Sequence, residues 1–148
     1  MKNCHNVILR VFVYEHEDNA RILETLKELS GAEVKVSSTE TKAGDEKSLI
    51  IIHKVTLAKD RQINAFLKKL TSSLSEEQKE MLIRQENRLD DDGNYFVRLD
   101  KNKLLEGIYH ITDRGSCFHI RLCLAAFPKT KEKCLQKIRE IFKTKPDN

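Results

Sequence analysis

Acidic side chains gathered in one short segment are the first residues of this sequence that could do chemistry. Asp90, Asp91 and Asp92 directly precede Gly93, and carboxylate oxygens are the ligands that divalent cations such as calcium prefer. The three acids are consecutive, however, so they lack the alternate spacing and the closing glutamate of a calcium loop. We therefore interpret the segment as a polar turn and expect no metal site there.

Histidines and cysteines are the other candidates for catalysis or metal binding, but they are scattered. No two histidines are four residues apart, the cysteines form no C-x-x-C pair, and no glycine-rich phosphate loop is present. They are His5, His16, His53, His110, His119, Cys4, Cys117, Cys123 and Cys134. We expect a protein without catalytic activity or cofactor. Free thiols, and the lack of a signal peptide or a long apolar segment, predict a cytoplasmic protein that does not span a membrane.

Basic side chains offer a clearer chemistry, because they can bind phosphate. The chain has 148 residues and a net charge of +4. Residues 129–148 carry seven basic and three acidic residues, a balance that equals the net charge of the whole chain. We predict a basic helix at about 129–145, with Lys129, Lys131 and Lys133 as candidate RNA contacts. The alternative is a solvated face that keeps the protein soluble.

Further basic residues lie on predicted strands. Along 117–125, apolar residues alternate with His119 and Arg121, so these two occupy the opposite face from the apolar set. By the same alternation Arg10 and Arg98 share faces with aromatic residues of their own strands. Arginines mixed with aromatics on an open sheet suit RNA, because guanidinium groups pair with phosphates while rings stack on bases. Intramolecular salt bridges or a dimer interface are the alternatives. A further alternative is that Phe12 and Phe96 lie on the buried face, because the alternation does not fix which face of the sheet is open.

A third basic group follows Asp100 at the predicted start of a short helix. Lys101 and Lys103 stand in its first turn, where backbone N–H groups favour anions. Both are candidate RNA contacts. The alternative is that Asp100 caps the helix and the lysines are only solvated.

Periodicity and turn residues predict the elements that position these side chains. We expect strands at 6–14, 33–41, 48–57, 95–100, 108–112 and 117–125, with a hairpin loop at 43–46. Helices are expected at 19–30, 60–74, 75–88, 100–107 and about 129–145. The order βαββααβαββα indicates an α+β fold in one domain over residues 1–148. Its sheet would be mostly antiparallel, with helices packed on one side.

One segment of the chain carries a long, ordered motif. It has the pattern R-x-D-x-x-G-N-x-[YF]-[FVL]-R-[FL]-D-K-x-x-x-x-x-G. The matching residues are Arg88, Asp90, Gly93, Asn94, Phe96, Arg98, Asp100, Lys101 and Gly107. Through this motif the sequence resembles an archaeal family of RNA-binding proteins, formerly a domain of unknown function, whose members are described as predicted exosome subunits.

The resemblance implies a fold similar to that of ribosomal protein L5, RNA binding, and a homodimer. Together with the basic residues it leads us to expect a non-catalytic RNA-binding protein. Such a protein would act in archaeal RNA processing or degradation with the exosome, or in ribosome-linked metabolism with ribosomal components. The alternative is a protein-interaction or scaffold subunit whose sheet face is a dimer or complex interface.

Overall fold

The computed structural model of the chain describes residues 2–31, 34–43 and 48–143. Its strands are β1 (Cys4–Tyr14), β2 (Val36–Ala43), β3 (Ser48–Leu57), β4 (Asn94–Asp100) and β5 (Cys117–Leu124). Its helices are α1 (Asn19–Ser30), α2 (Asp60–Ser73), α3 (Glu76–Arg84), a 3-10 turn η1 (Glu86–Arg88), α4 (Lys101–Leu105) and α5 (Lys131–Phe142). The order βαββααβαβα confirms the predicted α+β class.

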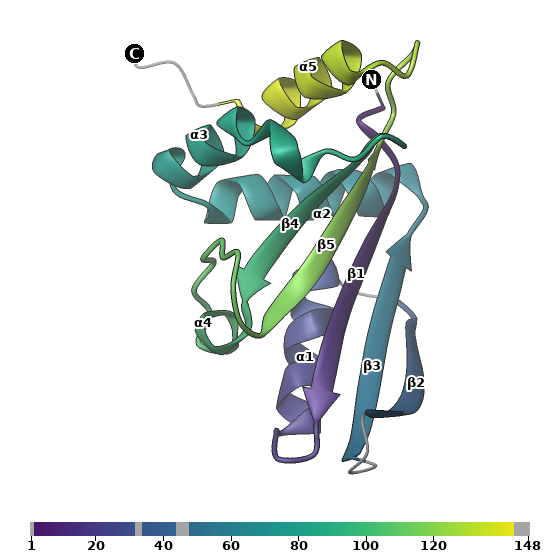
Figure 1. The fold of residues 1–148 in the computed structure, drawn as a ribbon, viewed down its shortest axis with the longest axis vertical. Helices are drawn as coiled ribbons and strands as arrows, with labels where there is room; N and C mark the ends of the chain where they lie inside the picture. The colour runs from purple at the N-terminus through teal and green to yellow at the C-terminus, as the bar shows by residue number, and fades with distance from the viewer. Residues whose placement is uncertain (1, 32–33, 44–47, 144–148) are drawn as a thin grey trace.

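The five strands form one sheet in the order β2-β3-β1-β5-β4, and every neighbouring pair is antiparallel. Figure 1 shows α1 and α2 across one face of this sheet, with α3 and α5 side by side at one end and α4 at the lower end of β4. Within the described ranges no helix covers the opposite face, which we call the open face. The expected arrangement of helices on one side is therefore confirmed.

Alternation along the strands decides which side chains enter the core. In β1 the valines and leucine at 7, 9, 11 and 13 are buried against the helices, and in β5 the same holds for Phe118, Ile120, Leu122 and Leu124. The residues between them necessarily point to the open face, because successive side chains in a strand point to opposite sides. The sequence predicted both alternations correctly.

Side-chain caps begin several of the helices where the sequence predicted them. Asp18 accepts a hydrogen bond from the backbone N–H of Arg21 at 3.1 Å, and Ser75 accepts one from Gln78 at 3.2 Å. Asp100 caps α4 by accepting from the N–H of Lys103 at 3.0 Å. Each cap satisfies a helix N–H that has no partner within the helix.

The predicted strand at 108–112 is wrong. Only Ile111 forms a bridge, to Leu99, and the segment runs along β4 as an irregular flank. Two backbone bonds flank this bridge: the N–H of Asp100 donates to His110 O at 2.8 Å, and the N–H of Thr112 donates to Arg98 O at 2.9 Å. The N–H of Ile111 points away from β4 and donates to the Gln78 side chain of α3 at 2.8 Å. The segment therefore pairs with β4 at a single bridge and is also anchored to α3, so it forms no strand.

Three predicted features fall partly outside the described residues. These are the hairpin loop at 43–46, the start of the strand at 33–41 and the last two residues of the helix at 129–145. Among the described residues, no helix is both long and apolar enough to cross a membrane.

Candidate RNA-binding face

Four basic or potentially basic residues stand in one row across the open face. Lys54 on β3 is paired with Arg10 on β1, Arg10 is paired with His119 on β5, and His119 is paired with Arg98 on β4. We call these residues the basic row. Neighbouring strands lie about 4.8 Å apart, so the row spans roughly 14 Å of the sheet. Strands distant in sequence thus bring four side chains of one chemical kind together.

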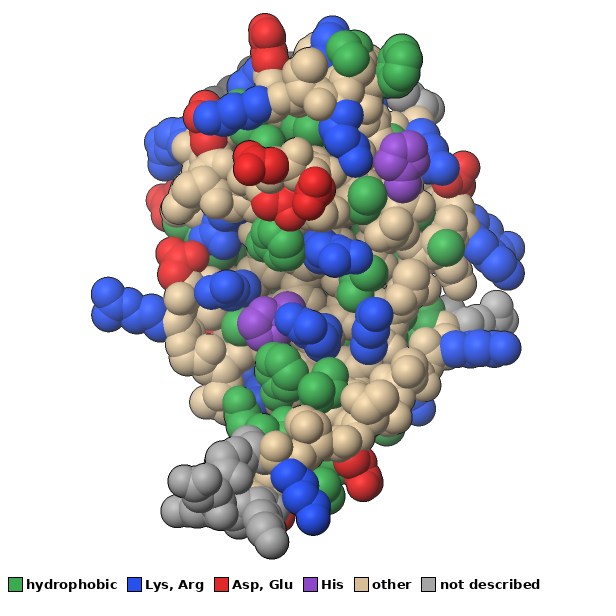
Figure 2. Space-filling view, turned by 45° about the vertical axis from the view of Figure 1, so that its right-hand side comes forward, with side chains coloured by type: hydrophobic (Ala, Val, Ile, Leu, Met, Phe, Trp, Pro, Cys, Tyr) green, Lys and Arg blue, Asp and Glu red, His purple; other side chains and the backbone are tan. Residues whose placement is uncertain are grey.

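The next row along the strands adds one more cation and an aromatic ring. Arg121 on β5 is paired with Ile8 on β1 and with Phe96 on β4. Phe96 is 40% exposed. The two rows border a hollow of about 280 Å³. We call it the arginine hollow; its lining residues are Ile8, Arg10, Lys54, Phe96, Val97, Arg98, His119, Ile120 and Arg121. Figure 2 shows Lys and Arg side chains gathered around a histidine near the middle of this face, with hydrophobic side chains above and below.

In the ranges that the structure describes, the cations of this face form no salt bridges, although the charge of Asp90 interacts with that of Arg121. Across the described residues, none of Arg10, Lys54, Arg98 or Arg121 forms an ion pair with an Asp or Glu. The guanidinium group of Arg10 lies 5.3 Å from the centre of the Phe12 ring, and Nε of Arg121 is buried with no hydrogen-bond partner in the part of the chain that the structure describes. The intramolecular salt bridges considered from the sequence are therefore not formed.

His119 takes its protonation state from this environment. Burial lowers the pKa of its imidazole, and the positive charges of Arg10, Arg98 and Lys101 lower it further. Because the ordinary value is about 6.5, the ring is neutral near pH 7. A neutral imidazole between two arginines can donate or accept a hydrogen bond without adding to the repulsion within the row.

Lys101 and Lys103 lie away from the basic row, on α4. The side chain of Lys101 is only 1% exposed. Its Nζ donates to the carbonyl oxygen of Phe12 at 2.7 Å and to the carboxylate of Glu17 at 3.0 Å. Lys101 therefore supports the fold and is left out of the RNA surface that we propose below. Lys103 is exposed, and Asp100 caps its helix as the alternative interpretation held.

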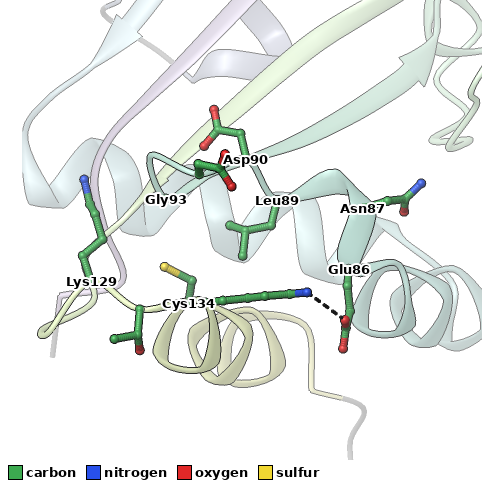
Figure 3. A pocket seen from close by; sticks show the side chains of 10 residues that line it. Glu86, Asn87, Leu89, Asp90, Gly93, Lys129 and Cys134 are labelled. Atoms are coloured by element: carbon green, nitrogen blue, oxygen red, sulfur yellow. Dashed lines mark ion pairs between the residues drawn. The ribbon is translucent and has the colours of Figure 1, made fainter.

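Two of the three candidate lysines near the start of α5, Lys129 and Lys131, border a different hollow, of about 520 Å³, and Lys133 lies outside its lining. Figure 3 shows it between α5 and the turn before β4, with acidic and basic side chains on its walls. Lys131 pairs with Glu86 at 3.5 Å, and the side chain of Lys129 packs over Gly93. Asp90 and Asp91 also line the hollow. Charges of both signs make this a weaker anion site than the open face.

Comparison with known proteins shows the family to which this chain belongs. The model of a family described as RNA binding matches residues 6–124, about four-fifths of the chain. The chain belongs to this RNA-binding family. It is 28% identical to RNA-binding protein PAB1135 of Pyrococcus abyssi over 143 residues, which cover 93% of this chain and 92% of the relative.

Solved structures agree with the family match. The fold resembles that of Mth689, a DUF54 protein from Methanothermobacter thermautotrophicus, with a TM-score of 0.80, 27% identity, and coverage of 96% of this chain and 100% of the other. AF2318 from Archaeoglobus fulgidus, also DUF54, gives a TM-score of 0.83 at 27% identity, covering 95% and 99% of the two chains. The family resemblance predicted from the motif is confirmed. The residues matched by the family model include every strand of the basic row but end before α5.

The family motif between Arg88 and Gly107 has mainly a structural role. Most of its residues form the turn before β4 and the junction of β4 with α4, and they do not face outward. Asp90 accepts hydrogen bonds from the backbone N–H groups of Asp92 at 2.9 Å and Asn94 at 2.8 Å. Burial alone would raise the pKa of Asp90, but these bonds and the charge of Arg121 leave it lowered. The polar turn predicted for the acids is thus confirmed, and no cluster of metal-ligating residues occurs in the described ranges.

The two arginines of the motif, Arg88 and Arg98, have different roles. Arg88 is nearly buried and pairs with Asp113 at 2.7 Å, which fixes the segment before β4 against the loop before β5. Arg98, in contrast, points to the open face and joins the basic row. Lys54 completes that row and was not among the sequence candidates. Its position between the buried His53 and Val55 was the available signal.

Proposed function

We propose that this chain binds RNA through the open face of its sheet, with Arg10, Lys54, Arg98 and Arg121 contacting phosphates and His119 contributing a hydrogen bond. The observation that carries the proposal is the basic row, whose cations have no acidic partner. Cations that stay uncompensated on an open surface attract phosphate, and guanidinium groups bind it with two parallel hydrogen bonds. Lys129, Lys131, Lys133 and Lys103 are candidates for weaker, peripheral contacts.

The relative from Pyrococcus abyssi, which is named an RNA-binding protein, supports this role. The relatives also suggest the cellular processes in which the chain would act. We propose that the chain acts as a non-catalytic RNA-binding protein of the cytoplasm. Its processes would be RNA processing or degradation, with exosome components as partners, or ribosome-linked metabolism. The relatives named above are archaeal, and we extend that setting to this protein.

A salt titration of RNA binding tests the proposal directly. Four phosphate contacts to a single strand give a slope of log affinity against log salt of about −2.8, which is a roughly 50-fold loss between 50 and 200 mM salt. Arg98→Gln should weaken binding to every RNA sequence and reduce the slope by about 0.7.

The matched control is Lys68→Gln, which removes the same charge from an exposed position on α2, across the sheet from the basic row. It should leave both affinity and slope unchanged. Equal effects of the two substitutions would show that binding follows net charge and not the open face, and the proposal would be abandoned.

A second candidate function is a protein-interaction role, with the open face buried in a homodimer or complex. The exposed rings of Phe96 and Tyr14, 40% and 39% accessible, favour it. Light scattering combined with Arg98→Glu separates the two functions. Loss of a dimer with unchanged RNA affinity would support the interface; loss of RNA affinity in a monomer would support RNA binding.

A further inference from the structure

A second hollow adjoins the arginine hollow on the open face. It has a volume of about 310 Å³ and is lined by Phe12 and Tyr14 of β1, by the residues at 115–117 before and within β5, and by Lys101. His119 lines both hollows. The two hollows therefore lie next to each other along β5, with the imidazole between them, and we call the pair the groove.

The second hollow differs from the first in its chemistry, and we call it the aromatic hollow. Tyr14 is 39% exposed, and its ring stacks on His16 with 6.3 Å between ring centres and has Nζ of Lys101 5.2 Å from its centre. Phe12 meets His119 edge to face at 5.7 Å. The basic residue in the lining, Lys101, is 1% exposed and already paired with Glu17. One end of the groove thus offers cations together with the Phe96 ring, and the other offers the rings of Phe12 and Tyr14.

The two ends are separated by a short stretch of strand. Arg121 lines the arginine hollow and Cys117 lines the aromatic hollow. Four residues of β5 at about 3.3 Å each separate them by roughly 13 Å. A nucleic-acid strand lying along β5 would therefore meet cations first and rings further on.

We propose that this groove binds an unpaired segment of RNA, with backbone phosphates in the arginine hollow and a base against Tyr14 in the aromatic hollow. This inference rests on the proposed function and names the form of RNA that the site takes. In an A-form duplex the bases stack on each other and proteins contact mainly phosphates and 2′-hydroxyls. Exposed rings at the end of a groove serve only a strand whose bases are free to stack on them.

Fluorescence anisotropy with two RNAs tests the inference. A labelled oligouridine strand and a duplex of the same length are compared at equal salt for the unaltered protein, Tyr14→Leu and Tyr14→Phe. We expect the single strand to bind more tightly. Tyr14→Leu should weaken its binding about 5- to 150-fold, the range seen when a base-stacking aromatic is removed. The conservative Tyr14→Phe should retain affinity, and duplex affinity should be the same for all three proteins.

A second readout needs no variant. The fluorescence of 2-aminopurine placed in the single strand should fall on binding, because stacking on a ring quenches it. Equal affinity for both RNAs, no loss with Tyr14→Leu, or unquenched 2-aminopurine would overturn the inference while leaving RNA binding by the open face intact. Absence of binding to either RNA would instead overturn the proposed function.

Discussion

Replacing Lys101 by methionine separates support of the fold from RNA contact at a residue that belongs to the family motif. The Nζ of Lys101 donates to Phe12 O at 2.7 Å and to both carboxylate oxygens of Glu17, at 3.0 and 3.2 Å. Methionine is close to lysine in length but supplies no donor. The substitution therefore removes the Lys101 donor from the Phe12 carbonyl and from the Glu17 carboxylate, which keeps its hydrogen bond from the Tyr14 N–H.

The loss of folding free energy in Lys101→Met depends on how deeply Glu17 is buried. Removing one member of a buried ion pair costs about 3–5 kcal/mol when the other stays buried. The side chain of Glu17 is 16% exposed, so water can partly hydrate it after the substitution. We therefore expect Lys101→Met to lower the free energy of unfolding by about 2–3 kcal/mol. With the urea sensitivity usual for small domains, the midpoint falls by roughly 1–2 M.

Urea denaturation followed by circular dichroism, and RNA anisotropy on the same samples without denaturant, measure the two effects separately. Lys103→Met is the matched control, since Lys103 is exposed on the same helix; its effect should stay within about 0.5 kcal/mol. Folded Lys101→Met should lose less RNA affinity than Arg98→Gln, because Lys101 lines the aromatic hollow but its ammonium group is bonded to Phe12 and Glu17. Wild-type stability, or an affinity loss as large as that of Arg98→Gln, would refute the reasoning.

Three further predictions concern the fold and its pH dependence. Gly93→Ala should destabilise by roughly 1–2 kcal/mol in urea unfolding, because Gly93 has a φ of +82° and a Cβ there would lie 3.0 Å from Cε of Lys129; unchanged stability would contradict this. Burial and the charge of Lys27 lower the pKa of His53. The stability that its neutral ring contributes is therefore fully present above about pH 6.5 and is lost as the pH falls below that value. His53→Gln should remove this pH dependence from the free energy of unfolding. Burial raises the pKa of Glu17, but the hydrogen bonds from the Tyr14 N–H and Lys101 leave it lowered; the stability it contributes is present above about pH 4.5 and lost on further acidification, and Glu17→Gln should remove that dependence.

His53 also illustrates a contact that the sequence could not predict. It is 3% exposed, with Nδ1 hydrogen-bonded to Ser38 Oγ at 2.7 Å and Nε2 to Asn19 Oδ1 at 2.6 Å. The three residues come from β3, β2 and α1. The pattern of a lone histidine in an apolar strand gives no hint of either partner, because both bonds depend on how the elements pack.

Local signals in the sequence predicted local structure well. Strand alternation placed Arg121 opposite the apolar residues of its strand and put Arg10 on one face with Phe12, and the acids before Gly93 formed the expected turn. These features depend on neighbouring residues alone, through side-chain direction and short-range hydrogen bonds. The two faces of each strand could therefore be anticipated one strand at a time, but which face the helices leave open depends on the assembled sheet.

Long-range packing accounts for what the sequence did not show. From the sequence, Lys101 is predicted to be an exposed lysine at the start of a helix. In the fold its side chain is buried, because it forms an ion pair with Glu17, which is 84 positions away in the sequence. Lys54 was not grouped with the arginines because its place beside Arg10 depends on the register of β3 against β1. The order of the strands, which sets His119 between Arg10 and Arg98, is likewise a property of the assembled sheet.

An NMR titration with a short single-stranded RNA tests the central claim most directly, because it reports which residues meet the ligand. We expect the Nε–H signals of Arg10, Arg98 and Arg121 and the ring signals of His119 to shift in proportion to bound RNA, while signals of α1 and α2 stay in place. Shifts confined to α5, or spread over the helical face with the basic row unaffected, would contradict the claim that RNA is bound by the open face of the sheet.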